Sequence, residues 1–302
     1  MDISEFLNRN WHEHAEQTAV VAARLPDGLA LLSGSGQATR LAELAVHVLG
    51  EHLGRWDDGL AFLERMVVMP SAGDRTDQQA IRRCQATLHY CAGRRDAFED
   101  LLRRASISGV AEDDDRVRVL AVAAAALVGQ DRITDAQATF DAALSHAVSP
   151  AASVSRTLAV IGNNLSWDLE AYISRSPEEA AMMIRAAWIG LKYSTLAGGW
   201  LEEGRAEHRL SRSLSADGRG PAALTHAVAC LRICAQNHAD DMEHFFAYEA
   251  ISRAHSAAGS AAEAETARDT AADLLDALVP ALRERCMPVL AALDATIGNF
   301  RS

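Results

Sequence analysis

The sequence predicts an all-α protein built as an α-solenoid, that is, a stack of antiparallel helical hairpins. A helix–turn–helix pattern recurs about every forty residues, which is the spacing of helical repeat proteins. The long segments are dominated by Ala, Leu, Glu, Arg and Gln, all strong helix formers, and runs of alternating β-branched residues are missing. Because no single hairpin can bury its apolar face alone, we expect neighbouring hairpins to stack.

The N-terminal segment, residues 1–39, is predicted to cap the array. Apolar residues from Ile3 to Trp11 recur at intervals of three and four, which predicts a helix over about 2–24. The turn-forming sequence Pro26–Gly28 is expected to end it.

Six helical hairpins are predicted over 40–279, followed by a C-terminal capping helix and tail over 280–302. Turns that contain Gly or Asp and run into an alanine separate the two helices of each hairpin. Ser176, Pro177 and Glu179 form a capping box with proline at the first helical position, and Thr134 heads a similar pattern. The expected hairpins are 40–69, 74–107, 113–148, 151–193, 199–239 and 240–279.

Small residues at the helix crossings and Gly-containing turns resemble the tetratricopeptide repeat (TPR) superfamily. The best local matches are Gly54–Trp56, Ile161–Asn163, Gly218–Cys230 and Tyr248–Ala271. The spacing drifts between about 38 and 44 residues, whereas the family unit has about 34, so helices or turns are lengthened here. The resemblance implies a right-handed superhelix, with the first helix of each hairpin on the concave face.

Charge and hydropathy restrict the partner and the location. A formal net charge of −12 disfavours nucleic acid or an anionic membrane as the main partner, because phosphate binding needs clustered Lys and Arg. The longest apolar run, Val119–Val128, is half of the roughly twenty residues that a membrane span needs. The N-terminus lacks the basic and apolar regions of a secretory signal, so we expect a cytoplasmic protein.

Two histidine-containing patterns are candidate metal sites. His226, Cys230, Cys234 and His238 follow one another at four-residue intervals, but the first and last stand about 18 Å apart on a helix, too far to share one ion. Residues 11–14, Trp-His-Glu-His, lack the four-residue histidine spacing of a metalloprotease motif. Neither pattern predicts a metal site, and no cofactor or catalytic residue is predicted. The five cysteines are expected to be reduced and packed.

A basic stripe on the first helices of the later hairpins is the candidate binding site. Arg205, Arg209 and Arg212 lie on or near one helical face, with His208 between them. Such a stripe could bind a carboxylate-bearing segment through forked hydrogen bonds. The full candidate set is Asn163, Arg205, His208, Arg209, Arg212 and Arg253.

Two alternatives concern the residues around this stripe. Glutamates on the same helix could neutralise the arginines locally and leave only a solvated face. These are Glu202, Glu203 and Glu207. The aromatic patch over 244–248, with Trp200, could be a binding hot spot or the core of an alanine-rich hairpin.

The TPR resemblance implies a non-catalytic protein- or peptide-binding scaffold that uses the concave face of its C-terminal repeats. The carboxylate clamp of chaperone-binding members is matched at Asn163 alone, since Ala159, Arg209, Phe246 and Ala250 stand at its other positions. The expected partner is therefore a protein or peptide with an acidic segment, but not a chaperone, and an oligomer of this chain is left open. The alternatives are a sensory domain that binds a signalling peptide or small molecule, and an enzyme on an α-solenoid frame.

Overall fold

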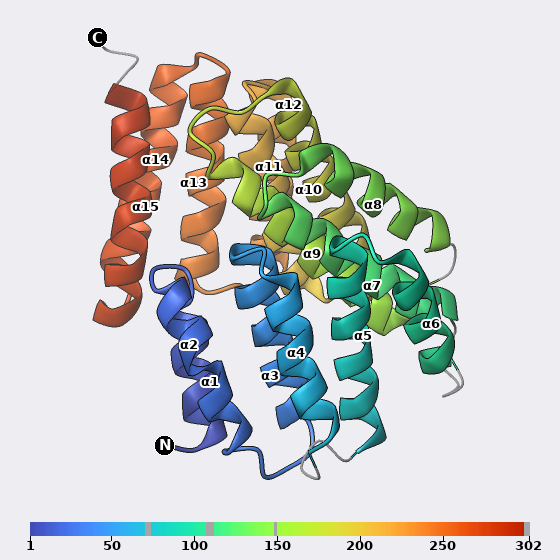
Figure 1. Cartoon of the computed structure of the whole chain (residues 1–302). Coiled ribbons are helices and arrows are strands. Elements are labelled where there is room, and N and C mark those ends of the chain that lie inside the picture. Colours follow the sequence, from blue (N-terminus) through green and yellow to red (C-terminus); the bar gives the residue numbers. More distant parts are fainter. Residues whose placement is uncertain (70–73, 107–111, 148–149, 299–302) are drawn as a thin grey trace. The chain divides into compact units, whose positions relative to one another are not determined.

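The computed structural model describes residues 1–69, 74–106, 112–147 and 150–298, and every regular element in these ranges is a helix (Figure 1). The all-α prediction is confirmed. The contacts divide the chain into two compact units, Met1–Val154 and Ser155–Ser302, and each is described by itself. None of the described helices has an apolar stretch of the length needed to cross a membrane.

The N-terminal unit contains α1 to α8 and one π-helical segment, η1. A core cluster joins α1 to α5 and includes Phe6, Leu41, Leu63 and Ile81. The helices are α1 Ile3–Glu13, α2 Thr18–Leu29, α3 Gln37–Ala45, η1 Val46–His52, α4 Trp56–Val67, α5 Arg75–Cys91, α6 Arg95–Ser106, α7 Glu112–Val128 and α8 Ile133–His146.

The prediction of one helix over 2–24 is wrong, because this segment belongs to two helices, α1 and α2. Side chains bind backbone carbonyls at the break: His14 Nδ1 bonds to the Trp11 oxygen at 2.6 Å, and the Thr18 hydroxyl donates to the His14 oxygen at 2.7 Å. Pro26, expected to end a helix, lies inside α2. Buried Leu25 and Leu29 beside it contribute apolar packing that offsets the backbone hydrogen bond that proline cannot donate.

The C-terminal unit contains most of α9 and all of α10 to α15. Helix α11 packs against α10, α12 and α13, and α13 also packs against α14 and α15. A hydrogen bond of 2.6 Å between the Ser166 and Ser213 hydroxyls joins α9 to α11. The bounds are α9 Ala152–Glu170, α10 Pro177–Ala197, α11 Trp200–Ala216, α12 Gly220–Gln236, α13 Asp241–Ala257, α14 Ala261–Ala277 and α15 Pro280–Gly298.

The helix bounds differ from the predicted hairpin bounds in places, since α3 begins at Gln37, before residue 40, and α10 ends at Ala197, beyond residue 193. Residues 107 and 148, at the ends of two of these hairpins, and the tail 299–302 lie outside the described residues. The capping box of Ser176 is confirmed, since its Oγ accepts from the Glu179 nitrogen at 3.2 Å and the Glu179 carboxylate accepts from its own nitrogen at 2.6 Å. The capping box predicted at Thr134 is wrong, because α8 begins two residues earlier than that box requires, with Arg132 in place of Thr134 as the N-cap residue.

Candidate ligand-binding site

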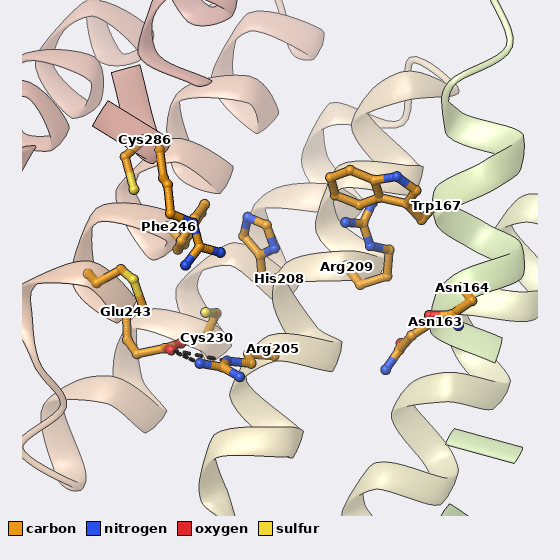
Figure 2. Close-up of a pocket in the computed structure, with 12 residues that line it drawn as sticks. Asn163, Asn164, Trp167, Arg205, His208, Arg209, Cys230, Glu243, Phe246 and Cys286 are labelled. Carbon is orange, nitrogen blue, oxygen red and sulfur yellow. Dashed lines mark hydrogen bonds and ion pairs between the residues drawn. The ribbon is translucent and has the colours of Figure 1, made fainter. Parts of the chain in front are cut away.

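Four of the six candidate residues line one cavity of about 450 Å³ in the C-terminal unit: Asn163, Arg205, His208 and Arg209. Figure 2 shows Asn163, Asn164 and Trp167 of α9 on one side, Phe246 of α13 and Cys286 of α15 opposite, and the α11 residues between them. The remaining two candidates, Arg212 and Arg253, line a second hollow of about 210 Å³, together with Glu170. The structure therefore brings the predicted set together around α11, but over two neighbouring hollows.

Two glycines hold α9 against α10 and so place Asn163. A Cβ on Gly162 would lie 2.6 Å from the Ala186 carbonyl oxygen, and a Cβ on Gly190 would collide with Asn163 Oδ1. That oxygen is buried and has no hydrogen-bond partner among the described residues. The carboxamide nitrogen of Asn163 is left as a donor for the cavity, which its residue lines.

Arg209 and Arg212 share the carboxylate of Glu170 on α9. Arg209 Nη1 donates to Oε2 at 2.5 Å, and Arg212 Nε donates to Oε1 at 2.9 Å. The Arg209 guanidinium also lies over the Trp167 ring, 4.3 Å from its centroid, and the residue is 7% exposed. Burial lowers the pKa of Arg209 to about 10 against the opposing charge of Glu170, so the side chain is still protonated at neutral pH.

Glu249 of α13 is fully buried and is contacted by two arginines and a histidine. Arg212 Nη1 lies 3.4 Å from Oε1, Arg253 donates to the same oxygen, and His208 Nε2 is 2.8 Å from Oε2. Although burial alone would raise the pKa of Glu249, the charge of Arg212 and the hydrogen bond from His208 hold it below its ordinary value. Burial lowers the pKa of His208, so at neutral pH the neutral imidazole donates its Nε2 hydrogen to Glu249.

The carboxylates that neutralise the three arginines of α11 come from neighbouring helices. Two of the glutamates expected to do so on the same helix have other partners: Glu202 accepts from the Gly199 nitrogen at 2.8 Å, and Glu207 pairs with His226 at 2.6 Å. The candidate arginines therefore do not form an open stripe. Their ion pairs connect α11 to α9 and to α13. Helical spacing within one segment of the sequence does not predict contacts of this kind between helices.

The cavity keeps an excess of positive charge. Arg205 of α11 pairs with Glu243 of α13, with Nε to Oε1 at 3.0 Å, yet its side chain remains 56% exposed (Figure 2). Arg285 of α15 lines the cavity and has no ion pair within the described part of the chain. Five arginines line the two hollows, whereas two glutamates line them and a third, Glu249, pairs with Arg212 and Arg253. The arginines are Arg205, Arg209, Arg212, Arg253 and Arg285, and the glutamates are Glu170, Glu243 and Glu249.

The aromatic patch over 244–248 is divided between core and cavity. Phe245 is completely buried, whereas Phe246 is partly buried and lines the cavity. Trp167 was missed in the sequence, although it follows Asn163 by one helical turn and therefore shares its face. Arg285 was missed because the last helix was interpreted as a cap, and its place beside α13 depends on tertiary packing.

All five cysteines are free thiols, four buried and Cys84 half-buried, so the expectation of packed thiols agrees with their burial. Cys230 lines the cavity, and its pKa is raised by the hydrogen bond with Cys234 and by burial. The thiol is therefore protonated at neutral pH. His226, in the same four-residue series, pairs instead with Glu207 and lies edge-on to Trp188.

Comparison with known proteins adds no family to this description. No protein-family model matches the chain, and comparison with curated proteins finds no significant relative. The resemblance to TPR proteins accordingly stays a prediction, and the functional argument depends on the residues of the site.

Proposed function

We propose that the C-terminal unit is a non-catalytic binding module that holds a short acidic segment of a partner protein in the cavity between α9, α11, α13 and α15. The observation that carries the proposal is a local excess of arginine in a chain whose formal net charge is −12. In such a chain an anion is attracted to few places, and a cavity lined by cations concentrates that attraction. The proposal includes the TPR-like superhelix, with α9, α11 and α13 on its inner face; the ion pairs from α11 to both neighbours support this order.

The lining side chains specify the chemistry of the bound segment. Arg205, Arg285 and the Asn163 carboxamide nitrogen are donors, which suits a carboxylate with its four acceptor sites. Trp167 and Phe246 offer apolar faces on opposite sides of the same cavity. The segment that fits best therefore carries an Asp, Glu or terminal carboxylate next to an apolar side chain.

The chemistry of the cavity supports binding over catalysis. Cys230 and Cys286 are nucleophile-type side chains in the lining, and a raised pKa keeps each in the unreactive thiol form. His208, the general-base type, is engaged by Glu249, which also holds Arg212 and Arg253. These contacts order the wall of the cavity and favour a preformed binding surface.

A small anionic molecule is the second candidate, favoured by the size of the cavity. About 450 Å³ lies within the roughly 300–1,000 Å³ of small-molecule sites. The same volume accommodates a few residues of a peptide but not a folded domain. Both ligands would use the same arginines, so a direct comparison is needed to separate them.

The test uses pairs of peptides that differ only in charge. Labelled peptides with Asp or Glu beside Leu or Trp are compared with their Asn or Gln counterparts by fluorescence anisotropy. We expect the acidic member of a pair to bind and Arg285→Ala to weaken it by about 1.5 kcal/mol, the lower end for a hydrogen bond to a charged group. Arg219→Ala is the matched control, because Arg219 is exposed and pairs with Asp217 outside the cavity.

Three outcomes are distinguishable. Equal affinity for acidic and amide peptides, or equal losses in Arg285→Ala and Arg219→Ala, would refute charge recognition at this cavity. A panel of small aliphatic and aromatic carboxylates, screened by thermal shift, tests the second candidate. If one of them binds in an Arg285-dependent way and no peptide does, the ligand is a small molecule.

A further inference from the structure

Three histidines of the N-terminal unit converge at one place. His14 follows the last residue of α1, whereas His47 and His52 belong to η1. One side-chain nitrogen from each lies within 4.8 Å of the others, and the Nε2 atoms of His47 and His52 are 3.1 Å apart. His14 and His47 are half-buried and His52 is exposed, so the cluster opens to solvent.

The π-helical geometry of η1 brings His47 and His52 together. In an α-helix, residues five apart point about 140° away from each other, because each residue turns the chain by about 100°. A π-helix pairs residue i with i+5, so the two imidazoles share a side. The segment is held in place from the turn after α7, since Gln130 Nε2 donates to the Glu51 carbonyl oxygen at 2.7 Å.

Hydrogen bonds at the other ring nitrogens orient two of the three imidazoles. His14 Nδ1 donates to the Trp11 carbonyl oxygen at 2.6 Å, and His47 Nδ1 lies 3.1 Å from the Glu51 carboxylate. With their hydrogens on Nδ1, both rings present an Nε2 lone pair. If His52 carries its hydrogen on Nε2, it can donate that hydrogen to the Nε2 lone pair of His47. Neither His47 nor His52 then has a hydrogen left to donate to the Nε2 lone pair of His14.

We propose that His14, His47 and His52 bind one divalent transition-metal ion, zinc in the first instance, with water in the fourth position. Tetrahedral zinc with Zn–N bonds of about 2.0–2.1 Å places its ligand nitrogens about 3.3 Å apart. The observed separation of 3.1 Å between two Nε2 atoms is close to this value, and small ring rotations bring the third nitrogen in. The ion fills the point at which the lone pairs meet, which a single proton cannot do.

Surrounding groups fit the same assignment. Glu51 accepts from His47 in the manner of the carboxylates that orient histidine ligands of zinc. Burial lowers the pKa of His14 and of His52, which favours the neutral imidazole that a metal requires. Imidazole ligands suit zinc, copper and nickel, and disfavour calcium and magnesium, which prefer oxygen.

Trp11 provides an optical probe of the site. Its ring centroid lies 5.1 Å from that of His47 and 5.5 Å from that of His14. A paramagnetic ion such as nickel at the three histidines should quench the fluorescence of this tryptophan, one of five in the chain. Trp11→Phe should abolish that part of the quenching and leave zinc affinity unchanged.

The deciding experiment is a titration of the full chain with zinc chloride by calorimetry, repeated with nickel chloride by tryptophan fluorescence. We expect one ion per chain, and at least about 100-fold weaker binding in His52→Ala, beyond the 10–100-fold effect of removing an orienting partner. His52 is exposed, so far-ultraviolet dichroism should show an intact fold for this variant. His12→Ala, an exposed histidine of α1 outside the cluster, is the control and should bind as the wild type does. If the wild type binds zinc no more tightly than His52→Ala, or if His12→Ala loses as much affinity, the three histidines are only a hydrogen-bonded cluster.

Discussion

The guanidinium of Arg209 and the carboxylate of Glu170 form a buried ion pair at 2.5 Å between α11 and α9. The sequence places Arg209 at the centre of a basic stripe, where its removal would affect ligand affinity and leave stability unchanged. The ion pair also gives Arg209 a role in stability, because Glu170 is mostly buried and its charge is balanced by Arg209 and Arg212.

Arg209→Ala should therefore destabilise the C-terminal unit. Removing one member of a buried ion pair costs about 3–5 kcal/mol, and we expect about 3 kcal/mol because Glu170 keeps Arg212. Urea unfolding followed by circular dichroism measures the change. Arg219→Ala, at an exposed pair with Asp217, should stay within about 1 kcal/mol of the wild type. If Arg209→Ala unfolds at the same urea concentration as the wild type, the ion pair of Arg209 and Glu170 does not contribute to the free energy of unfolding.

The pair of His208 and Glu249 should make stability depend on pH. Burial lowers the pKa of His208 below its ordinary 6.5, so as pH falls through 6.5 the unfolded chain binds a proton that the folded chain refuses, and stability is lost. The pKa of Glu249 is lowered too, so its contribution is present above the unfolded carboxyl pKa and is lost as pH falls below it.

His208→Gln isolates the histidine part, because glutamine can still donate to Glu249 but does not titrate. The free energy of unfolding, measured for both proteins between pH 7 and pH 5, should fall more steeply in the wild type. Parallel curves would show that His208 has an ordinary pKa in the folded chain.

Gly162→Ala should destabilise the crossing of α9 and α10. The added Cβ would lie 2.6 Å from the Ala186 carbonyl oxygen, a backbone atom that moves only with its helix. We expect a loss of about 1–3 kcal/mol, typical of overpacking, and weaker ligand binding because Asn163 follows directly. Gly204→Ala is the control: its Cβ would first meet Ile233 at 3.4 Å, so helix propensity should stabilise it by up to about 1 kcal/mol. Equal effects of the two substitutions would contradict a tight crossing at Gly162.

Glu51→Gln should weaken zinc binding by about 10–100-fold without abolishing it, because the amide still accepts from His47 but carries no charge. Calorimetry on this variant and on His12→Ala gives the comparison. A loss as complete as that of His52→Ala would make Glu51 a direct ligand, whereas unchanged affinity would show that it does not orient His47.

Local sequence signals were enough to predict the all-α class of this protein. The 3.6-residue periodicity, the turns and the capping box of Ser176 depend on residues a few positions apart, so these signals can be identified in the sequence alone. The N-terminal segment was mispredicted at Pro26, where buried Leu25 and Leu29 outweigh a local helix-breaking signal.

The sites depend on contacts that the sequence does not contain locally. Asn163, Arg205, His208 and Arg209 were placed at one site from helical spacing and the family resemblance, but their carboxylate partners, Glu170, Glu243 and Glu249, come from other helices. His14 is far from His47 and His52 in the sequence, and α-helical spacing would point His47 and His52 in different directions. The π-helical geometry of η1, which the sequence does not predict, brings His47 and His52 together. Periodicity determines which face a residue occupies on its own helix, whereas packing alone decides which faces meet, and both the arginine cavity and the histidine cluster lie where faces meet.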